Sequence, residues 1–446
     1  MVYTCSNCDS QYPKWSGRCS ECGKWGTLKE TAETAPKKSP LGKLALPAAP
    51  AKVLTLDQTG ASNVKRHQVS GFPAAQLFPD GLVLGSLTLV TGEPGAGKSS
   101  LCLQAALAAS NAADVLYVTA EESAAQVHER AARFGSAPQH FMLAEVTNLE
   151  QIVATIASKK PHLTVIDSLQ MITSDSVQGE PGSLNQVRTV TATLLACARD
   201  SQSALVLVGH VTKDGAVAGP KTLEHLVDAV YYLEADRKSA YRLLRSYKNR
   251  FGETGKVLVM QLGRTGFSPV ANPATIFVQN YAPKPGSVLT ISLIDDQFFF
   301  VEVQSLVTKS SFGYAKRTSS GFPRSRLELL LAIMKKHLHV DLDSHDVYVN
   351  IAGGFHLNEP AMDSAVVLSV LSSLQEKTLP AGTVVFGEVG LSGELRIVRE
   401  TGARLKEMEK HGFKRALVPP ISGKPKSMVQ IDSFDTLPAL IKRLGW

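Results

Sequence analysis

Hydrophobic residues in the central part of the chain form short continuous runs rather than an alternating pattern. The runs lie at residues 84–90, 115–118, 163–168 and 204–210. Helix-forming stretches separate some of them, as at 100–109 and 123–134. Continuous apolar strands that alternate with helices are typical of a parallel sheet covered on both faces. The pattern therefore predicts an α/β domain, which we place at residues 56–270.

The hydrophobic pattern changes near Asn272-Pro273, where pairs of strands replace the alternation of strands and helices. Residues 287–294 and 297–303 flank a turn at Asp295-Asp296, as expected for a hairpin. We therefore expect a second domain, of the α+β class, at residues 271–446.

The first 30 residues contain four of the six cysteines, and their spacing indicates a metal site. Cys5-x-x-Cys8 and Cys19-x-x-Cys22 form two pairs, each able to bind one side of a tetrahedral ion. Four thiolates without a nearby histidine favour structural Zn²⁺, with a disulfide pair or an iron–sulfur centre as the alternatives. Residues 31–55 are rich in Ala, Pro and Lys, which indicates a flexible linker between this zinc knuckle (residues 1–30) and the core.

The composition is that of an ordinary soluble protein, with 44% hydrophobic and 20% charged residues in a chain of 446. A net charge of +7 permits binding to nucleic acid without demonstrating it. No run approaches the ~18 apolar residues of a membrane span. The N-terminus also lacks the charged and apolar regions of a secretory signal. We therefore expect a cytoplasmic protein without a membrane partner.

The clearest chemical motif follows the first apolar run. Residues 92–99, Gly-Glu-Pro-Gly-Ala-Gly-Lys-Ser, match the phosphate-loop pattern G-x-x-x-x-G-K-[ST] between a strand and a helix-forming stretch. In such a loop backbone N–H groups point at an anion, Lys98 reaches the β- and γ-phosphates, and the Ser99 hydroxyl binds Mg²⁺. The flanking pattern disfavours the alternative, a chance glycine-rich turn. We expect the residues that bind ATP to be Gly92, Glu93, Pro94, Gly95, Ala96, Gly97, Lys98, Ser99 and Ser100.

Acidic residues follow the next two apolar runs, where an ATPase needs them. Asp167 suits the Walker B role of holding Mg²⁺ through water, although an acid at this position could also cap the next turn. Glu121 and Glu122 follow the run at 115–118, and an ATPase needs a carboxylate there to orient the attacking water. We assign this role to Glu121. The sequence leaves Glu122 open as the alternative, with a helix N-cap as the competing role for the second acid.

A basic segment lies late in the predicted ATPase domain. Residues 236–252 hold six basic side chains and one acid, and they include the string Lys248-Asn249-Arg250-Phe251-Gly252. By charge alone, a solvated basic strand explains this segment as well as a functional site does. The acid after the second strand, the apolar run ending in Asp167 and this string resemble the RecA-like ATPases. Together with the N-terminal cysteine pairs, the string is similar to the RadA (Sms) family of DNA-repair proteins, and the resemblance covers essentially the whole chain.

The resemblance implies a RecA-like fold for the ATPase domain and assembly into a homo-oligomeric ring, expected to be a hexamer. In RecA-like relatives the matching basic residues reach the γ-phosphate bound by the neighbouring subunit. Lys248 and Arg250 are therefore expected to act in trans. His210 resembles a sensor of γ-phosphate loss, with an ordinary core histidine as the alternative.

Two segments that follow core strands, 173–182 and 212–221, match the loops that track single-stranded DNA in the channel of RecA-like rings. Lys213 and Lys221, with nearby glycines, suit phosphate contacts that carry no sequence information. Neither segment contains an aromatic residue for base stacking. Further along, residues 309–326 carry five basic side chains and no acid. Among these, Lys316 and Arg317 are expected to contact DNA.

The C-terminal domain resembles the Lon protease domain. The matching segments are 347–354, 361–374 and 386–394. The Lon family uses a Ser–Lys dyad, but the matching positions hold Ala361 and Gly402, so nucleophilic catalysis lacks both of its groups. A shifted dyad of Ser364 and Lys406 is the alternative. We expect a proteolytically inactive domain that serves assembly and DNA binding.

Together these features imply a DNA-dependent ATPase that acts in recombinational DNA repair with ATP, Mg²⁺ and Zn²⁺ as its cofactors. The resemblance implies a ring-forming motor on single-stranded and branched DNA, which promotes branch migration or strand extension of intermediates made by the RecA recombinase. The rival interpretations are an ATP-dependent protease of the Lon type and a nucleotide-switched DNA-binding protein without motor activity.

Overall fold

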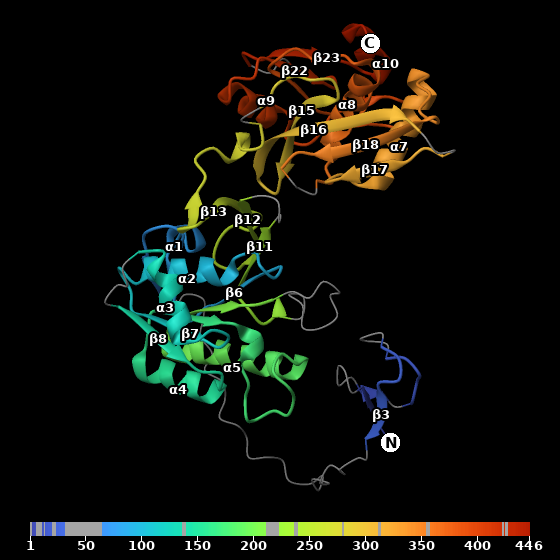
Figure 1. The fold of residues 1–446 in the computed structure, drawn as a ribbon. Coiled ribbons are helices and arrows are strands. Elements are labelled where there is room, and N and C mark those ends of the chain that lie inside the picture. Colours follow the sequence, from blue (N-terminus) through green and yellow to red (C-terminus); the bar gives the residue numbers. More distant parts are fainter. Residues whose placement is uncertain are drawn as a thin grey trace, which may run out of the picture. The chain divides into compact units, whose positions relative to one another are not determined.

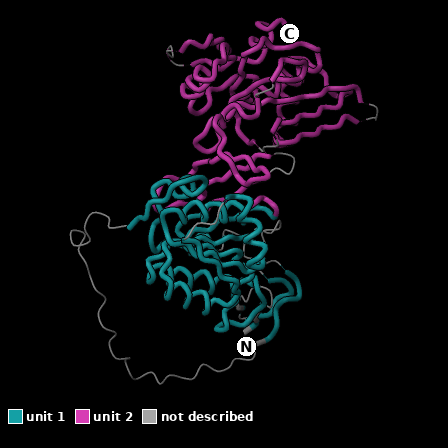
Figure 2. The backbone as a smooth tube through the Cα atoms, turned by 60° about the vertical axis from the view of Figure 1, so that its left-hand side comes forward, with its two compact units in different colours: residues 1–94, 98–230 teal, residues 95–97, 231–446 magenta. Residues whose placement is uncertain are grey.

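The computed structural model describes most of the chain outside the N-terminal linker. The described residues are 2–5, 11–12, 14–19, 24–31, 65–135, 140–210, 223–235, 240–278, 281–310, 314–353, 357–421, 423 and 427–446. They divide into two compact units (Figure 2): Met1–Pro94 with Lys98–Val230, and Gly95–Gly97 with Tyr231–Trp446. The second unit therefore holds the last strands of the predicted ATPase domain as well as the C-terminal domain.

The described part of the zinc knuckle is a small antiparallel sheet. Its strands are β1 (Val2–Cys5), β2 (Gln11–Tyr12) and β3 (Leu28–Thr31), in the order β2-β1-β3. An isolated antiparallel bridge joins Arg18 to Trp25, and the Cys19 N–H donates to the Lys24 carbonyl at 2.9 Å. Cys19 belongs to the same small core as Cys5.

The main part of the first unit is a parallel sheet flanked by helices (Figure 1). Its elements are β4 (Arg66–His67), α1 (Ala74–Leu77), β5 (Leu82–Val83), β6 (Leu87–Gly92), α2 (Lys98–Ala109), β7 (Val115–Thr119), α3 (Ala124–Ala132), β8 (Phe141–Glu145), α4 (Leu149–Lys159), β9 (Leu163–Asp167), the 3₁₀ turn η2 (Leu169–Met171), α5 (Leu184–Ser201) and β10 (Ala204–Val208). The strand order is β6-β10-β9-β7-β8, and each neighbouring pair is parallel. The predicted α/β core is confirmed.

The continuous apolar runs form strands that are buried along their full length. This holds for β6, β7, β9 and β10. Ile152 of α4 and Val190 of α5 share one core cluster with Leu89, Leu116 and Leu207 of the strands. Because side chains alternate across a strand, the remaining buried positions face the other side of the sheet, and α2 contacts β6, β7, β9 and β10. A strand enclosed on both faces has no polar period, which is why the runs were recognisable in the sequence.

Helix caps decide which residues remain at the carboxyl edge of this sheet. The Ser123 hydroxyl accepts a hydrogen bond from the Gln126 N–H, and the Gln126 side chain accepts one from the Ser123 N–H, which forms a capping box. Helix α3 therefore begins at Ala124. The pair Glu121 and Glu122 is left in the short turn after β7, the strand that pairs with β9.

The second unit begins with strands that continue the predicted ATPase domain. They are β11 (Ala229–Ala235), β12 (Tyr241–Asn249), β13 (Val257–Gly263) and β14 (Gly266–Pro269), in the order β14-β13-β12-β11. The pairs β12/β13 and β13/β14 are antiparallel. Beyond the paired strands, the Gly255 N–H donates to the Ser246 carbonyl, and residues 247–254 connect the two strands as the end of a hairpin.

Among the described residues, the C-terminal domain contains a seven-stranded mixed sheet in the order β17-β18-β16-β15-β19-β22-β23 (Figure 1). The elements of the domain region are η3 (Pro273–Thr275), β15 (Ser287–Ile294), β16 (Gln297–Lys309), β17 (Arg317–Ser320), α7 (Arg324–Leu338), β18 (His345–Ile351), η4 (Pro360–Met362), α8 (Asp363–Gln375), β19 (Thr383–Val385), β20 (Glu388–Val389), β21 (Leu395–Arg396), α9 (Thr401–Lys410), β22 (Arg415–Val418), β23 (Gln430–Ser433) and α10 (Leu437–Leu444). The hairpin about Asp295-Asp296 is confirmed, with Ile294 opposite Gln297.

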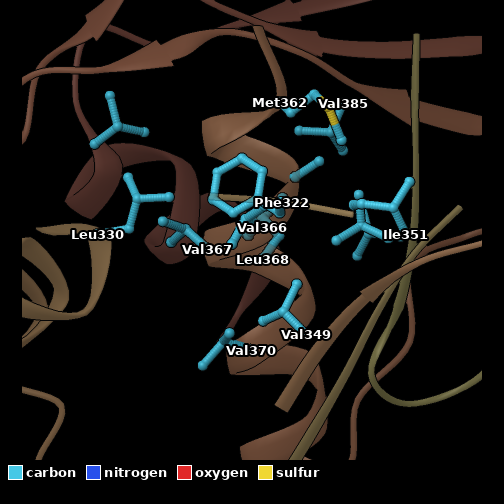
Figure 3. Packing of buried hydrophobic residues seen from close by; sticks show 14 of the residues in the cluster. Phe322, Leu330, Val349, Ile351, Met362, Val366, Val367, Leu368, Val370 and Val385 are labelled. Carbon is cyan, nitrogen blue, oxygen red and sulfur yellow. The ribbon is translucent and has the colours of Figure 1, made fainter. Parts of the chain in front are cut away.

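Helix α8 is the centre of the C-terminal core. All of its residues from Asp363 to Ser372 are buried. Figure 3 shows Val366 and Leu368 of α8 close to Phe322 and to Val349 of β18, and all four belong to one hydrophobic cluster. Its buried residues include polar ones, such as Ser369 and Ser372, whose hydroxyls are hydrogen-bonded inside the domain. This domain therefore has a full-sized core of its own.

Helices long and apolar enough to cross a membrane are absent from the part of the chain that the structure describes.

Candidate active site

The phosphate loop lies between β6 and α2, as predicted, and fixes the Lys98 side chain. Lys98 is 3% exposed, and its Nζ donates hydrogen bonds of 3.0 Å to the carbonyls of Gly92 and Glu93. Burial lowers the pKa of Lys98, and the nearby Asp167 carboxylate opposes that shift. The ammonium is thus held in place by the loop that would cradle a phosphate.

Residues of β12 and β14 hold the middle of the phosphate loop from the other side. Gly97 has φ +101°, and a Cβ at this position would lie 3.0 Å from Cζ of Phe267. The Arg242 Nε donates to the Ala96 carbonyl at 3.2 Å. A side chain at position 97 would therefore meet both backbone strain and the Phe267 ring, so only glycine fits there.

The two residues predicted to hold Mg²⁺ are brought together. The Ser99 hydroxyl donates to Asp167 Oδ1 at 3.0 Å, and Asp167 is the last residue of β9. A hydroxyl and a carboxylate are hard oxygen ligands of the kind that Mg²⁺ prefers beside substrate phosphates. The donor set therefore fits the ion that the motif implies.

A buried tyrosine and a buried arginine that the sequence analysis missed stand behind Asp167. The Tyr117 hydroxyl donates to Asp167 Oδ2 at 2.6 Å, and Tyr117 is fully buried in β7. Arg130 Nη2 from α3 lies 3.7 Å from the same oxygen. Burial and the neighbouring Asp167 charge raise the pKa of Tyr117 well above its usual value, so its proton stays on the hydroxyl. A tyrosine inside a fully apolar run needs a hydrogen-bond partner for its hydroxyl, so the sequence offered a signal for Tyr117. The sequence offered no such signal for Arg130.

The adjacent acids Glu121 and Glu122 have different partners. Glu122 binds Arg130 through two contacts, 2.7 Å from Oε2 to Nη2 and 3.2 Å from Oε1 to Nη1. Glu121 Oε1 instead accepts a hydrogen bond from the Ser168 hydroxyl and lies 3.5 Å from Nε2 of His210. Burial, together with the nearby Lys98, lowers the pKa of His210, which favours its neutral form. Glu122 is therefore held in an ion pair, whereas Glu121 lies between a hydroxyl and an imidazole group.

Lys248 and Arg250 lie at the end of the β12–β13 hairpin. Lys248 is half-buried near the end of β12, and Arg250 is exposed in the turn that follows. The Asn249 side chain accepts a hydrogen bond of 3.0 Å from the Phe251 N–H, which shapes this turn. The string predicted from the sequence therefore forms a compact hairpin tip that presents Arg250 at the surface.

An ion triad anchors the base of the same hairpin. Arg245 of β12 lies 2.8 Å from Glu234 of β11 and 2.6 Å from Asp295 in the β15–β16 turn. Burial disfavours the charge of Arg245, but the two carboxylates outweigh it and raise its pKa. Gly255 in the hairpin also approaches this turn, because a Cβ there would lie 3.1 Å from Asp296 Oδ2. The hairpin is thus tied to the first turn of the C-terminal domain.

The zinc knuckle buries the two cysteines that the structure describes. Cys5 and Cys19 are 0% exposed and share a small core with Leu28. The Cys5 thiol lies 3.2 Å from the Thr27 hydroxyl, and the Cys19 sulfur lies 3.3 Å from the Tyr12 hydroxyl. Their predicted co-ligands Cys8 and Cys22 fall outside the described residues, and the described residues alone contain no group of three metal-ligating side chains. Two buried thiols at one core fit a structural ion such as zinc.

Neither the predicted nor the shifted dyad positions form a Ser–Lys pair in the described part of the C-terminal domain. Ala361 is fully buried in η4, and Gly402 is at the start of α9. Ser364 is 2% exposed and its hydroxyl has no hydrogen-bond partner among the described residues, whereas Lys406 points to solvent. The shifted dyad is therefore not assembled. Ion pairs with a buried partner lie close by instead, Arg326 with Asp363 and Arg404 with Glu359.

The four residues predicted to contact DNA differ in what the structure shows of them. Lys213 and Lys221 lie outside the described residues. Lys316 is exposed, next to the edge strand β17. The Arg317 guanidinium donates to the carbonyls of Leu342, at 2.7 Å, and His345. Arg317 thus links β17 to the start of β18 and the segment before it. These hydrogen bonds compete with a contact between the guanidinium and a phosphate.

Models of three protein families match the chain. The AAA domain matches residues 58–216, the rubredoxin metal binding domain matches residues 3–30, and subunit ChlI of Mg-chelatase matches residues 324–422. The first match confirms the predicted ATPase domain around the phosphate loop. The second confirms the metal-binding character of the N-terminal cysteine segment. The third lies inside the predicted protease-like domain.

Relatives from distant bacteria match nearly the whole chain, and each is named DNA repair protein RadA. The protein from Pseudomonas aeruginosa is 40% identical over 94% of this chain and 92% of its own length. The one from Brucella abortus is 39% identical over 95% of this chain and 92% of its own, and the one from Aquifex aeolicus is 38% identical over 98% and 96%. The phosphate loop, the Ser99–Asp167 pair and these matches agree, and the chain belongs to the RadA family of DNA repair proteins.

Proposed function

We propose that this protein is a DNA-dependent ATPase that works as a ring-shaped motor, a hexamer, in recombinational DNA repair. It moves on single-stranded and branched DNA and extends or migrates the branches that the RecA recombinase makes. The observation that supports the proposal is the Ser99–Asp167 hydrogen bond beside the buried Lys98 of the phosphate loop, with Glu121 near enough to Lys98 to favour its charge. The name of the relatives supports the role in repair.

In the proposed reaction, Lys98 and the loop N–H groups bind the β- and γ-phosphates of ATP. Mg²⁺, when held by Ser99 and Asp167, would neutralise charge on these phosphates. Glu121 orients the attacking water and accepts its proton while the bond from the γ-phosphorus to the leaving ADP oxygen breaks. The hydrogen bond from Ser168 fixes the Glu121 carboxylate for this task. Glu122 is already occupied by Arg130 and takes no part in proton transfer.

Lys248 and Arg250 would complete the site of the neighbouring subunit. Arg250 is exposed at a hairpin tip, a position from which a guanidinium can reach another chain. A cation supplied in this way stabilises the charge of the transition state and makes hydrolysis depend on assembly. Lys213 and Lys221 would follow the DNA backbone in the channel, and Lys316 and Arg317 would add contacts from the C-terminal domain.

The test is to measure ATP hydrolysis with and without single-stranded DNA, together with branch migration of a labelled three-strand intermediate. We expect DNA to stimulate hydrolysis and ATP to drive migration, with Lys98→Ala inactive in both assays. Hydrolysis that DNA stimulates without any migration or strand displacement would indicate a nucleotide-switched binding protein instead of a motor. Hydrolysis that DNA leaves unchanged would contradict the proposal altogether.

A further inference from the structure

Two tryptophans of the zinc knuckle point to solvent. Trp15 is 61% exposed and Trp25 is 75% exposed. Tryptophan is on average a well-buried residue, so two exposed indoles in one small domain call for a ligand. Trp446, at the other end of the chain, completes the set of three tryptophans and is half-buried.

One edge of the Trp25 ring lies against the chain although most of the ring is exposed. A Cβ on Gly17 would lie 3.5 Å from Cζ3 of this ring, so the ring edge lies over the Gly17 backbone. The Gly26 N–H donates to the Gly17 carbonyl at 2.8 Å, and Trp25 forms the isolated bridge with Arg18. The backbone on both sides of the ring is thus joined, and the rest of the ring is open to a ligand.

Basic residues accompany both rings. Each tryptophan follows a lysine, in the pairs Lys14-Trp15 and Lys24-Trp25. Segments 14–19 and 24–29 contain four basic side chains and no acid. Lys14, Arg18 and Lys24 are exposed. Aromatic rings next to cations are the combination that binds single-stranded nucleic acid, since bases stack on the rings and phosphates approach the cations.

We infer that Trp15 and Trp25 form a base-stacking platform for single-stranded DNA on the zinc knuckle. A protein partner fits less well, because lysine is depleted at the centre of protein interfaces where tryptophan is enriched. The inference deepens the proposed function and rests on its single-stranded DNA substrate. The two segments expected to line the channel, 173–182 and 212–221, contain no aromatic residue, so the knuckle supplies stacking that they do not.

The experiment uses tryptophan fluorescence of the full-length, zinc-loaded chain. A Trp446→Phe background leaves Trp15 and Trp25 as the only indoles. Titration with unlabelled oligo(dT) is followed by emission, and binding of a fluorescein-labelled oligo(dT) is followed by anisotropy. We expect emission to be quenched with the same midpoint as the anisotropy curve.

Trp25→Ala should weaken binding by about 5- to 150-fold, whereas Trp25→Phe should restore most of the affinity. Zinc content shows that each variant keeps its knuckle folded.

The outcomes separate this inference from the proposed function. Tight binding of oligo(dT) with unchanged emission, or with unchanged affinity of Trp15→Ala and Trp25→Ala, overturns the platform and leaves the DNA-dependent ATPase intact. Quenching by a partner protein but not by oligo(dT) overturns it as well, in favour of a protein interface. Absence of any binding to single-stranded DNA removes the proposed function and the platform together.

Discussion

At the scale of single residues, Glu121 and Glu122 have different neighbours, which fits the different tasks that we propose for them. Arg130 binds Glu122 and lies near Asp167, while Glu121 contacts Ser168 and His210. The sequence placed both acids after β7 but could not choose between them, because the choice depends on Arg130, eight residues further along and on the next helix. The motif that binds phosphate was fully predictable, since its residues are consecutive in the chain.

Glutamine substitutions test this division. Glu121→Gln should reduce ATP turnover by about 100-fold or more while ATP binding survives, because the water loses its base. Glu122→Gln should retain most of the turnover but lower the free energy of unfolding by about 1–2 kcal/mol, because a mostly buried Arg130 loses its counter-charge. Turnover and thermal unfolding are measured side by side on both variants. Loss of turnover in Glu122→Gln alone would show that the roles are reversed.

Tyr117→Phe tests the support behind Asp167. The change removes only the hydroxyl that donates to Asp167 Oδ2, so the carboxylate loses one buried partner and its fixed orientation. We expect a loss of about 1–2 kcal/mol in stability and a higher Mg²⁺ requirement. The readout is the thermal stabilisation by ADP as Mg²⁺ is titrated, which does not depend on turnover. A control is Tyr247→Phe, a tyrosine that is 59% exposed. Identical Mg²⁺ curves for Tyr117→Phe and wild type would exclude the positioning role.

At the scale of elements, the apolar runs predicted strands β6, β7, β9 and β10, and the turn at Asp295-Asp296 predicted the β15–β16 hairpin. Local signals sufficed because each element carries its own period or turn. The extension of β16 to Lys309 was not predictable, since it depends on pairing with β18 some forty residues later. The contact of Arg245 with Asp295 is equally non-local.

Asp295→Asn tests whether that contact positions the Lys248–Gly252 hairpin. The substitution keeps the shape of the turn but removes the charge that binds Arg245. We expect the KM for ATP to stay unchanged and the DNA-stimulated kcat to fall on the order of fivefold, because the hairpin tip loses its anchor. Glu328→Gln, which breaks the exposed pair with Arg324 in the same unit, is the matched control and should leave kcat unchanged. Equal kcat values for the two variants would refute the positioning role.

We expect the folding of the zinc knuckle to depend on its metal. The purified chain should contain about one zinc, bound by Cys5, Cys8, Cys19 and Cys22. Cys19→Ser should lose the metal while the nucleotide-dependent thermal transition of the core persists, because residues 31–55 separate the two. Metal analysis by mass spectrometry decides the matter. Iron in a fresh preparation, or no metal at all, would contradict the zinc assignment.

At the scale of the whole molecule, the chain combines an ATPase core, an N-terminal segment that matches a metal-binding family and a protease-like C-terminal domain. Ala361 is enclosed in the C-terminal core, and the Ser364 hydroxyl has no hydrogen-bond partner among the described residues. The family follows from matches that cover nearly the full length of the chain.

Mixing two inactive variants tests the central claim most directly. Lys98→Ala chains cannot organise the phosphates, and Arg250→Ala chains cannot complete a neighbour's site, so each should be inactive alone with single-stranded DNA. In a 1:1 mixed ring, roughly a quarter of the interfaces would join an intact Lys98 to an intact Arg250 from the adjacent chain. We therefore predict that mixing restores DNA-stimulated hydrolysis up to about a quarter of the wild-type rate. Mixed rings, verified by co-purification of differently tagged chains, that remain inactive would contradict the account, as would normal hydrolysis by Arg250→Ala alone.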